Sequence, residues 1–151
     1  MAARILVIIE TVIAASGITA ALYCLLNGMP ELALHIVTLS VVGAVGLITF
    51  ASDFIVNRSG SGIEAGIANL AFALAAITAF FLNWGVAADA VIVLGYALYL
   101  VGVMLMLVWR VAAGHDRRLW YRVGASFVCS VMLLIFVVTA LQSAGLPPFS
   151  Y

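Results

Sequence analysis

The chain has 151 residues, of which 67% are hydrophobic and only 8% are charged, and its formal net charge at pH 7 is zero. A soluble domain carries about 25% charged residues, so this composition excludes an ordinary water-soluble protein. The basic segment 110–122 is no nucleic-acid signal either, because four arginines beside an apolar run more simply contact anionic lipid headgroups.

Several apolar runs follow one another, each long enough to cross a hydrocarbon core of roughly 30 Å as a helix. They are continuous and rich in Leu and Ala, without the alternation that is typical of a membrane β-barrel. The sequence therefore predicts an all-α integral membrane protein, a single polytopic domain over residues 1–151. Its five transmembrane helices are expected at about residues 5–26, 32–52, 63–82, 88–109 and 123–141.

Turn-forming residues separate the predicted helices. Gly28 and Pro30 end the first helix and begin the second, since glycine adopts left-handed geometry and proline cannot continue the preceding helix. A Gly/Ser-rich segment at 57–62 precedes the third helix. Only about five residues separate the third and fourth predicted helices. Because Asn83 and Gly85 lie among them, a tight hairpin is predicted there instead of one overlong helix.

The arginines predict an orientation. The chain has no lysine, and five helices place all six arginines on one side, whereas the connections on the other side carry Glu31 and Asp89. By the positive-inside rule the amino terminus is expected in the cytoplasm and the carboxyl terminus outside. Short loops and small size favour a bacterial cytoplasmic (inner) membrane. Four arginines are expected to contact anionic lipid headgroups: Arg110, Arg117, Arg118 and Arg122.

The first predicted helix contains one carboxylate, that of Glu10. A charged side chain at the centre of a membrane helix costs about 2.5–3.5 kcal/mol. Glu10 lies only about 9 Å of helix rise beyond Arg4, so we expect its carboxylate to reach the membrane boundary. Small residues share its helix face at spacings of three and four: Ala14, Gly17, Ala21 and Cys24. This face is predicted to pack closely against another helix.

Polar residues of the next helices complete a candidate cluster. On the second helix, one stripe runs from His35 near the outer boundary to Asp53 near the inner one. Asn69 of the third helix is expected at the same inner level as Glu10 and Asp53. Two hypotheses are open. The carboxylates pair with arginines or cap backbone groups and so fix which helices meet, or one of them is a proton or cation site. His35 is either an interfacial, hydrogen-bonded residue or a proton relay.

Several kinds of chemistry are excluded by the residue inventory. The two histidines, His35 and His115, are predicted on opposite sides, which excludes bis-histidine haem ligation within the chain. No zinc-ligand spacing, nucleophile motif or phosphate-binding loop is present. We therefore expect no metal site, no catalytic residues and no enzymatic activity. Cofactor binding stays open, because a lipid, quinone or pigment needs no recognisable motif, and no motif is specific enough to assign a family.

Two functions are compatible with this sequence. The preferred one is a structural or accessory subunit of a larger membrane assembly, which packs against transmembrane helices of foreign subunits or of a second copy. The alternative is a small oligomeric proton- or cation-coupled transporter or channel that uses Glu10, with Asp53 or His35 as further coupling groups.

Overall fold

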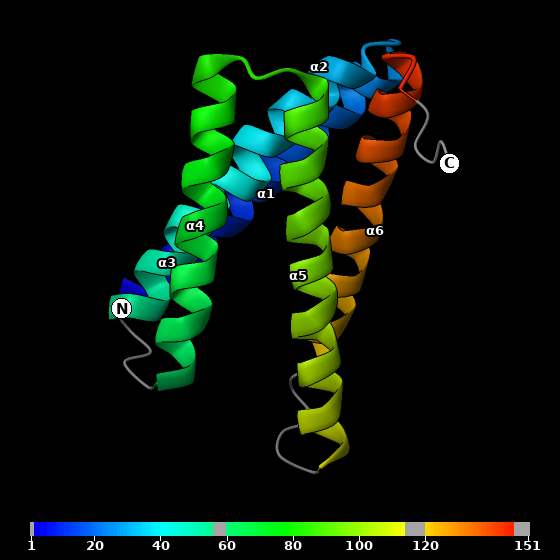
Figure 1. Ribbon diagram of the computed structural model, residues 1–151. Coiled ribbons are helices and arrows are strands. Elements are labelled where there is room, and N and C mark those ends of the chain that lie inside the picture. The colour runs from blue at the N-terminus through cyan, green and yellow to red at the C-terminus, as the bar shows by residue number, and fades with distance from the viewer. Residues whose placement is uncertain (1, 56–59, 114–119, 147–151) are drawn as a thin grey trace.

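The structure, a computed structural model, describes residues 2–55, 60–113 and 120–146. Within these ranges the chain is helical apart from short turns (Figure 1). The elements are α1 (Ala2–Leu26), α2 (Pro30–Val37), the π-helix η1 (Thr38–Ala44), α3 (Val45–Ile55), α4 (Gly60–Leu82), α5 (Val86–Ala112) and α6 (Trp120–Ser143). The consecutive segments α2, η1 and α3 form one long helix, which we call the central helix. Counted this way, five helices are long and apolar enough to span a membrane, which confirms the predicted number.

The turns arise where the sequence predicts them. Gly28 has a φ of 75°, and Pro30 is the first residue of α2, where its missing N–H is not needed for a helical hydrogen bond. After α4 the chain turns through Asn83, with a φ of 48°, and Gly85, with a φ of 87°. Glycine adopts such left-handed conformations readily. The predicted hairpin between two separate helices is therefore confirmed.

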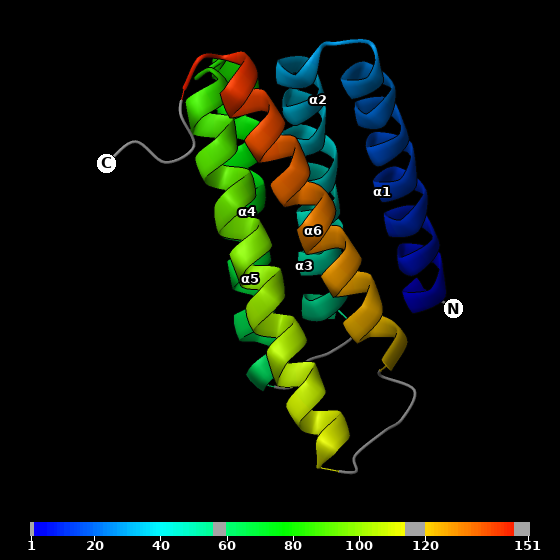
Figure 2. The ribbon, with the colours of Figure 1, turned by 90° about the vertical axis from the view of Figure 1, so that its right-hand side faces the viewer.

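The central helix holds the bundle together. It contacts all four other long helices, with α1 on one side and α4 and α5 on the other (Figures 1 and 2). Half of the residues in its apolar window are buried, against 11% in the window of α1. Its buried side chains pack with those of α5 and α6 in one hydrophobic core that includes Leu34, Val37, Val42, Val93, Leu133 and Phe136.

The two ends of the bundle differ in charge. The turns at 27–29 and 83–85 and the end of α6 lie at one end, which we call the acidic end because Glu31 and Asp89 belong to it (Figure 1). At the opposite end, the arginine end, α1 begins, α5 finishes and α6 begins. Arg110 and Arg122 are exposed there. Arg58, Arg117 and Arg118 lie outside the described residues, so their predicted positions stay a prediction.

The predicted small-residue face of α1 packs against the central helix. Gly17 and Ala21 are buried on this face. A Cβ added at Gly17 would overlap the Oγ and Cβ atoms of Ser40 in η1. The two backbones can approach this closely because Gly17 has no side chain.

A π-helix interrupts the middle of the central helix. Val45 donates its backbone N–H to the Ser40 carbonyl, five residues back. Within this segment, the hydroxyls of Thr38 and Ser40 bond to the carbonyls of the residues four positions earlier, which competes with the helical ladder. The wider turn changes the register of the following residues. The predicted single stripe from His35 to Asp53 is therefore wrong, because it assumes an unbroken α-helix.

Replacing Gly17 by Ala should destabilise the protein by about 1–3 kcal/mol, the usual penalty for overpacking a tight contact. The new methyl group would overlap Ser40 Cβ, which cannot move without its backbone. Gly102 of α5 is the matched control, because a Cβ there meets nothing within 4 Å, and Gly102→Ala should be neutral or slightly stabilising. Unfolding in a detergent titration measures both. The close contact is refuted if Gly17→Ala behaves like Gly102→Ala, and adding Ser40→Gly should restore stability.

Candidate functional site

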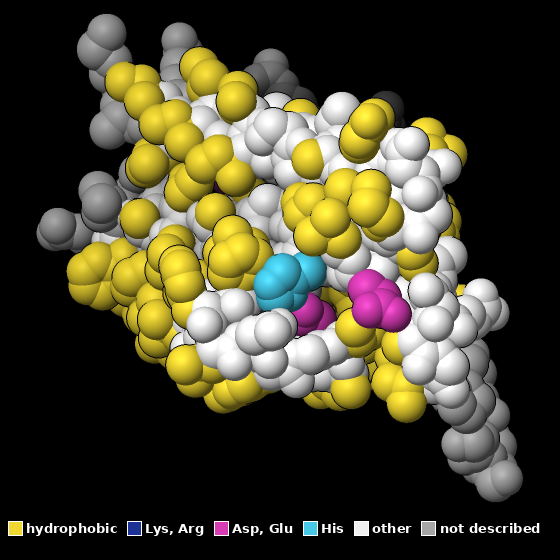
Figure 3. Space-filling model, turned by 90° about the horizontal axis from the view of Figure 1, so that it is seen from above, with side chains coloured by type: hydrophobic (Ala, Val, Ile, Leu, Met, Phe, Trp, Pro, Cys, Tyr) yellow, Lys and Arg dark blue, Asp and Glu magenta, His cyan; other side chains and the backbone are white. Residues whose placement is uncertain are grey.

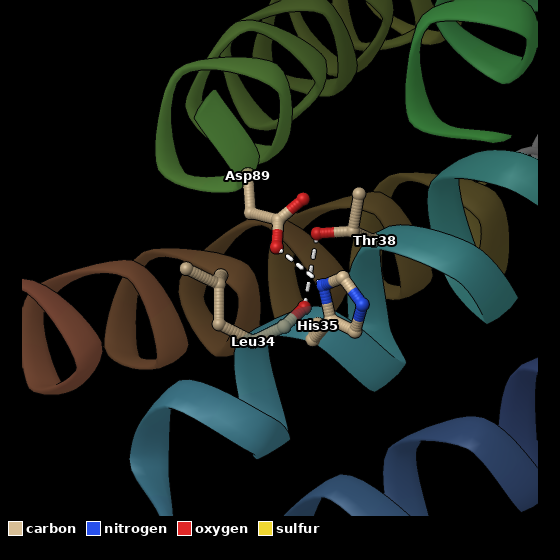
Figure 4. Close-up of polar contacts among 4 residues, drawn as sticks. All are labelled: Leu34, His35, Thr38 and Asp89. Carbon is tan, nitrogen blue, oxygen red and sulfur yellow. Dashed lines mark hydrogen bonds and ion pairs between the residues drawn. The ribbon is translucent and has the colours of Figure 1, made fainter. Parts of the chain in front are cut away.

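A histidine and an aspartate meet at the acidic end. His35 Nδ1 of α2 lies 2.7 Å from Asp89 Oδ2 of α5 (Figure 4). The Asp89 side chain is only 4% exposed and that of His35 is 25% exposed. Asp89 belongs to the first turn of α5, where the helix dipole stabilises a negative charge. The pair therefore connects two helices through the most deeply buried carboxylate that the structure describes.

Phe80 packs against one face of the His35 imidazole ring. The rings of His35 and Phe80 stack with centroids 4.4 Å apart and planes 20° apart. Phe80 comes from the last turn of α4. The stacking contact and the His35–Asp89 pair therefore together join α2, α4 and α5. The His35 ring is thereby held in one orientation by a charged partner at its edge and an apolar partner on its face.

The pair lines a hollow that opens at the acidic end. The hollow has a volume of about 240 Å³ and is lined by Glu31, Leu32, His35, Asn83, Gly85, Val86 and Asp89. Seen from above, the histidine and acidic side chains gather around it (Figure 3). No arginine or lysine contributes to this lining. With two carboxylates and at most one positive imidazole, its net charge is negative.

One atom of this site is left without a partner. Asp89 Oδ1 is buried and has no hydrogen-bond partner among the described residues. Figure 4 shows this oxygen turned away from the imidazole that binds Oδ2. Buried polar atoms are nearly always hydrogen-bonded, and leaving one unsatisfied costs about 1–3 kcal/mol. The carboxylate that lines the hollow therefore has one oxygen still able to accept a hydrogen bond, and a donor in the hollow reaches it when the Asp89 side chain turns.

A second polar group lies toward the arginine end. Thr49 Oγ1 of α3 donates to Glu10 Oε1 at 3.3 Å, across the contact between α1 and the central helix. Arg122 attracts the Glu10 carboxylate electrostatically and Asp53 repels it. Glu10 thus interacts electrostatically with Asp53 of α3 and with Arg122 in the first turn of α6.

Asn69 connects two other helices at this level. Asn69 Nδ2 of α4 donates to Tyr99 Oη of α5 at 3.5 Å, and Tyr99 Oη donates to the Ala65 carbonyl at 3.5 Å. Asn69 is buried. Its contact is an interhelical one, whereas His35, the fourth predicted member of the cluster, lies at the other end with Asp89.

Sequence reasoning missed the partners of His35. The sequence assigned His35 and Asp89 to the same side, but nothing in it indicated that the second and fourth long helices are neighbours. The signal that could have found the pair was the coincidence of one histidine and one carboxylate at the same depth. Phe80 gave no such signal, because an aromatic residue at a helix end is equally suited to contact lipid.

Comparison with known proteins gives no family for this chain: no family model, no curated protein and no solved structure matches it.

Removing the imidazole should destabilise the protein more than removing the carboxylate. His35→Phe keeps a ring against Phe80 but leaves the buried Asp89 charge without its partner, which costs about 3–5 kcal/mol. Asp89→Ala leaves the partly exposed His35 imidazole without its carboxylate partner. Because water can still reach this imidazole, the loss costs only about 1–3 kcal/mol. Unfolding free energies in detergent measure both variants.

The control for this comparison is Glu31→Ala, since Glu31 is exposed and its loss should change stability by about 0.5 kcal/mol or less. The double variant His35→Phe/Asp89→Ala should be more stable than His35→Phe alone, because the unpaired buried charge is gone. Equal stability of these two variants would contradict a charged contact between the residues.

Proposed function

We propose that the protein is a structural or accessory subunit that packs, through the outer face of α1, against transmembrane helices of other chains in a larger membrane assembly. The size and polarity of the exposed residues on that face support this proposal. From its beginning to Val12, α1 exposes large apolar side chains, and exposed large apolar side chains appear again from Tyr23 onward. Between them the exposed residues are small or carry hydroxyls: Ala15, Ser16, Thr19 and Ala20.

The other outer faces of the bundle differ from this one. Along α4, α5 and α6, large apolar side chains such as Leu74, Leu98 and Val131 recur among the exposed residues. Large apolar side chains are well suited to contact lipid tails, whereas small and hydroxyl residues are typical of contacts between membrane helices. The Ser16 and Thr19 hydroxyls are satisfied within α1 itself, so the face can enter an apolar contact without an unpaired donor.

The proposed setting is a bacterial cytoplasmic membrane with the arginine end in the cytoplasm. The described arginines of α5 and α6, Arg110 and Arg122, are exposed at that end, and Glu31 and Asp89 belong to the opposite one. Cytoplasmic boundaries carry the excess of positive charge in membrane proteins. Arg110 and Arg122, with Arg117 and Arg118 from the connection between α5 and α6, would contact anionic headgroups there.

Ala15→Leu should release the partner subunits. The larger side chain prevents close approach at the outer face of α1, where Ala15 is exposed. Ala71→Leu is the matched control, because Ala71 is exposed on α4 between the large side chains of Ile67 and Leu74. Tagged full-length protein purified in mild detergent should bring down stoichiometric foreign chains in the wild type and in Ala71→Leu. Recovery of only a homogeneous self-oligomer would count against the proposal, as would retention of those chains by Ala15→Leu.

A second candidate function is proton- or cation-coupled transport through Glu10, in an oligomer of this chain. It is favoured by the position of the Glu10 carboxylate, which is half-buried between α1 and the central helix and bonded to the Thr49 hydroxyl. Asp53 and Arg122 interact electrostatically with it. A carboxylate with a hydroxyl and a guanidinium nearby can exchange a proton or hold a cation as its neighbours move.

In liposomes, Glu10→Gln should abolish any pH-driven cation flux that the wild type shows, because the amide cannot exchange the proton. Glu64→Gln changes an exposed carboxylate at the start of α4 and should leave the flux unchanged. Circular dichroism checks that both variants fold. Flux that persists in Glu10→Gln removes this residue from the mechanism.

A further inference from the structure

The hollow at the acidic end has the features of a binding site. It is bounded by two helices and the turn before α5, and it contains Glu31, His35 and Asp89. Its lining is net negative, so it favours a cation over an anion. The described residues include no group of three or more His, Cys, Asp or Glu side chains that could hold a metal ion. Carboxylate oxygens accept hydrogen bonds, so a cation that carries N–H donors suits this lining.

We propose that this hollow binds a primary ammonium group, which donates hydrogen bonds to the carboxylates of Asp89 and Glu31. Asp89 offers an oxygen that no described residue satisfies, while its other oxygen is engaged by His35 at 2.7 Å. Glu31 is exposed at the rim and can turn toward the bound group. The oxygens of these two carboxylates only accept hydrogen bonds, and a primary ammonium has three N–H donors and no acceptor.

The burial of Asp89 determines which cations fit. Its side chain is 4% exposed, and Oδ1 is a buried atom. A water-sized group does not reach Oδ1 in the present side-chain position, so the Asp89 carboxylate must turn toward the hollow to accept a further hydrogen bond. Only a compact donor fits beside it then, and a charge-assisted hydrogen bond there is about twice as strong as a neutral one. A quaternary ammonium is too bulky and has no N–H, so it would leave Oδ1 unsatisfied. The site should therefore prefer primary over fully methylated ammonium.

The ammonium can come from two sources. The hollow opens where apolar helices end, which is the headgroup level if these helices cross a bilayer, so a phosphatidylethanolamine headgroup can reach it. A soluble amine can reach it from the aqueous phase. Both present the same chemistry to Asp89 and Glu31, and separate experiments distinguish them.

The soluble arm uses the full chain in nanodiscs of phosphatidylcholine, which has no primary ammonium. Histidine labelled with ¹⁵N reports the ring nitrogens of His35 during titration with ethanolammonium chloride at constant ionic strength. We expect a saturable shift that tetramethylammonium produces at least about tenfold more weakly, because it cannot donate a hydrogen bond. Asp89→Asn should weaken ethanolammonium binding by at least about tenfold, and Glu31→Gln by a smaller factor. Glu64→Gln, outside the hollow, should not change it.

The lipid arm uses nanodiscs that contain equal amounts of phosphatidylethanolamine and phosphatidylcholine. Native mass spectrometry after mild release reports the lipids that stay bound to the protein. Enrichment of phosphatidylethanolamine that is lost in Glu31→Gln identifies the lipid headgroup as the source. A saturable response to ethanolammonium without this enrichment identifies a soluble amine.

Two results would overturn the proposal. The first is the absence of both a saturable ethanolammonium response and phosphatidylethanolamine enrichment, which would mean that water alone satisfies Asp89. The second is an equal response to tetramethylammonium, which would mean that the hollow attracts cations without a hydrogen-bonded site. Glu31 is exposed and makes none of the described helix-to-helix hydrogen bonds, so Glu31→Gln tests the site even if Asp89→Asn fails to fold. Neither result depends on the proposed subunit role, which the purification of partner chains tests separately.

Discussion

The packing of four helices around the central helix is the constraint on which the rest of the structure depends. In an apolar medium each helix satisfies its own backbone, and polar side chains must find partners within the protein. The central helix contacts every other long helix, so its polar side chains can bond to polar side chains of the neighbouring helices. His35 near its beginning binds Asp89 of α5, and Thr49 near its end binds Glu10 of α1. Both contacts fix a neighbouring helix in place.

The π-helix in the middle allows the two ends of the central helix to face different neighbours. On an unbroken α-helix, His35 and Thr49 would lie along one stripe. With the wider turns of η1 between them, the first faces α5 and the second faces α1. Close packing continues through this segment, because Gly43 and Gly46 lie against α4 while Ser40 lies against Gly17 of α1. Small residues thus keep the helices close where the register changes.

The proposals concern different surfaces of one bundle. The outer face of α1 is apolar with small residues, which suits another helix, and the hollow at the acidic end is polar and negative, which suits a small donor. Glu10 lies apart from both regions, on the inner face of α1 toward the arginine end. A partner helix on the outer face would leave the hollow open, since α1 contributes no residue to its lining. The subunit role and the ammonium site are therefore compatible in the same molecule.

The sequence by itself determined the five apolar helices, the turns between them and the small-residue face of α1. These features depend on local chemistry: the length of an apolar run, the backbone freedom of glycine and the absence of a proline N–H. The grouping of Glu10 with Asp53 could also be proposed from depth alone, and the structure gives the two an electrostatic interaction.

Only the tertiary structure decided which helices are neighbours, and with them the site. His35 and Asp89 are 54 positions apart, and their contact requires α2 and α5 to be adjacent. Helices that are apolar on every side give no periodic signal of the face that is buried, so adjacency cannot be read from the pattern. The π-helix was equally hidden, because it results from competition among hydrogen bonds within one turn. The orphaned oxygen of Asp89, on which the proposed site depends, follows from that packing and not from any motif.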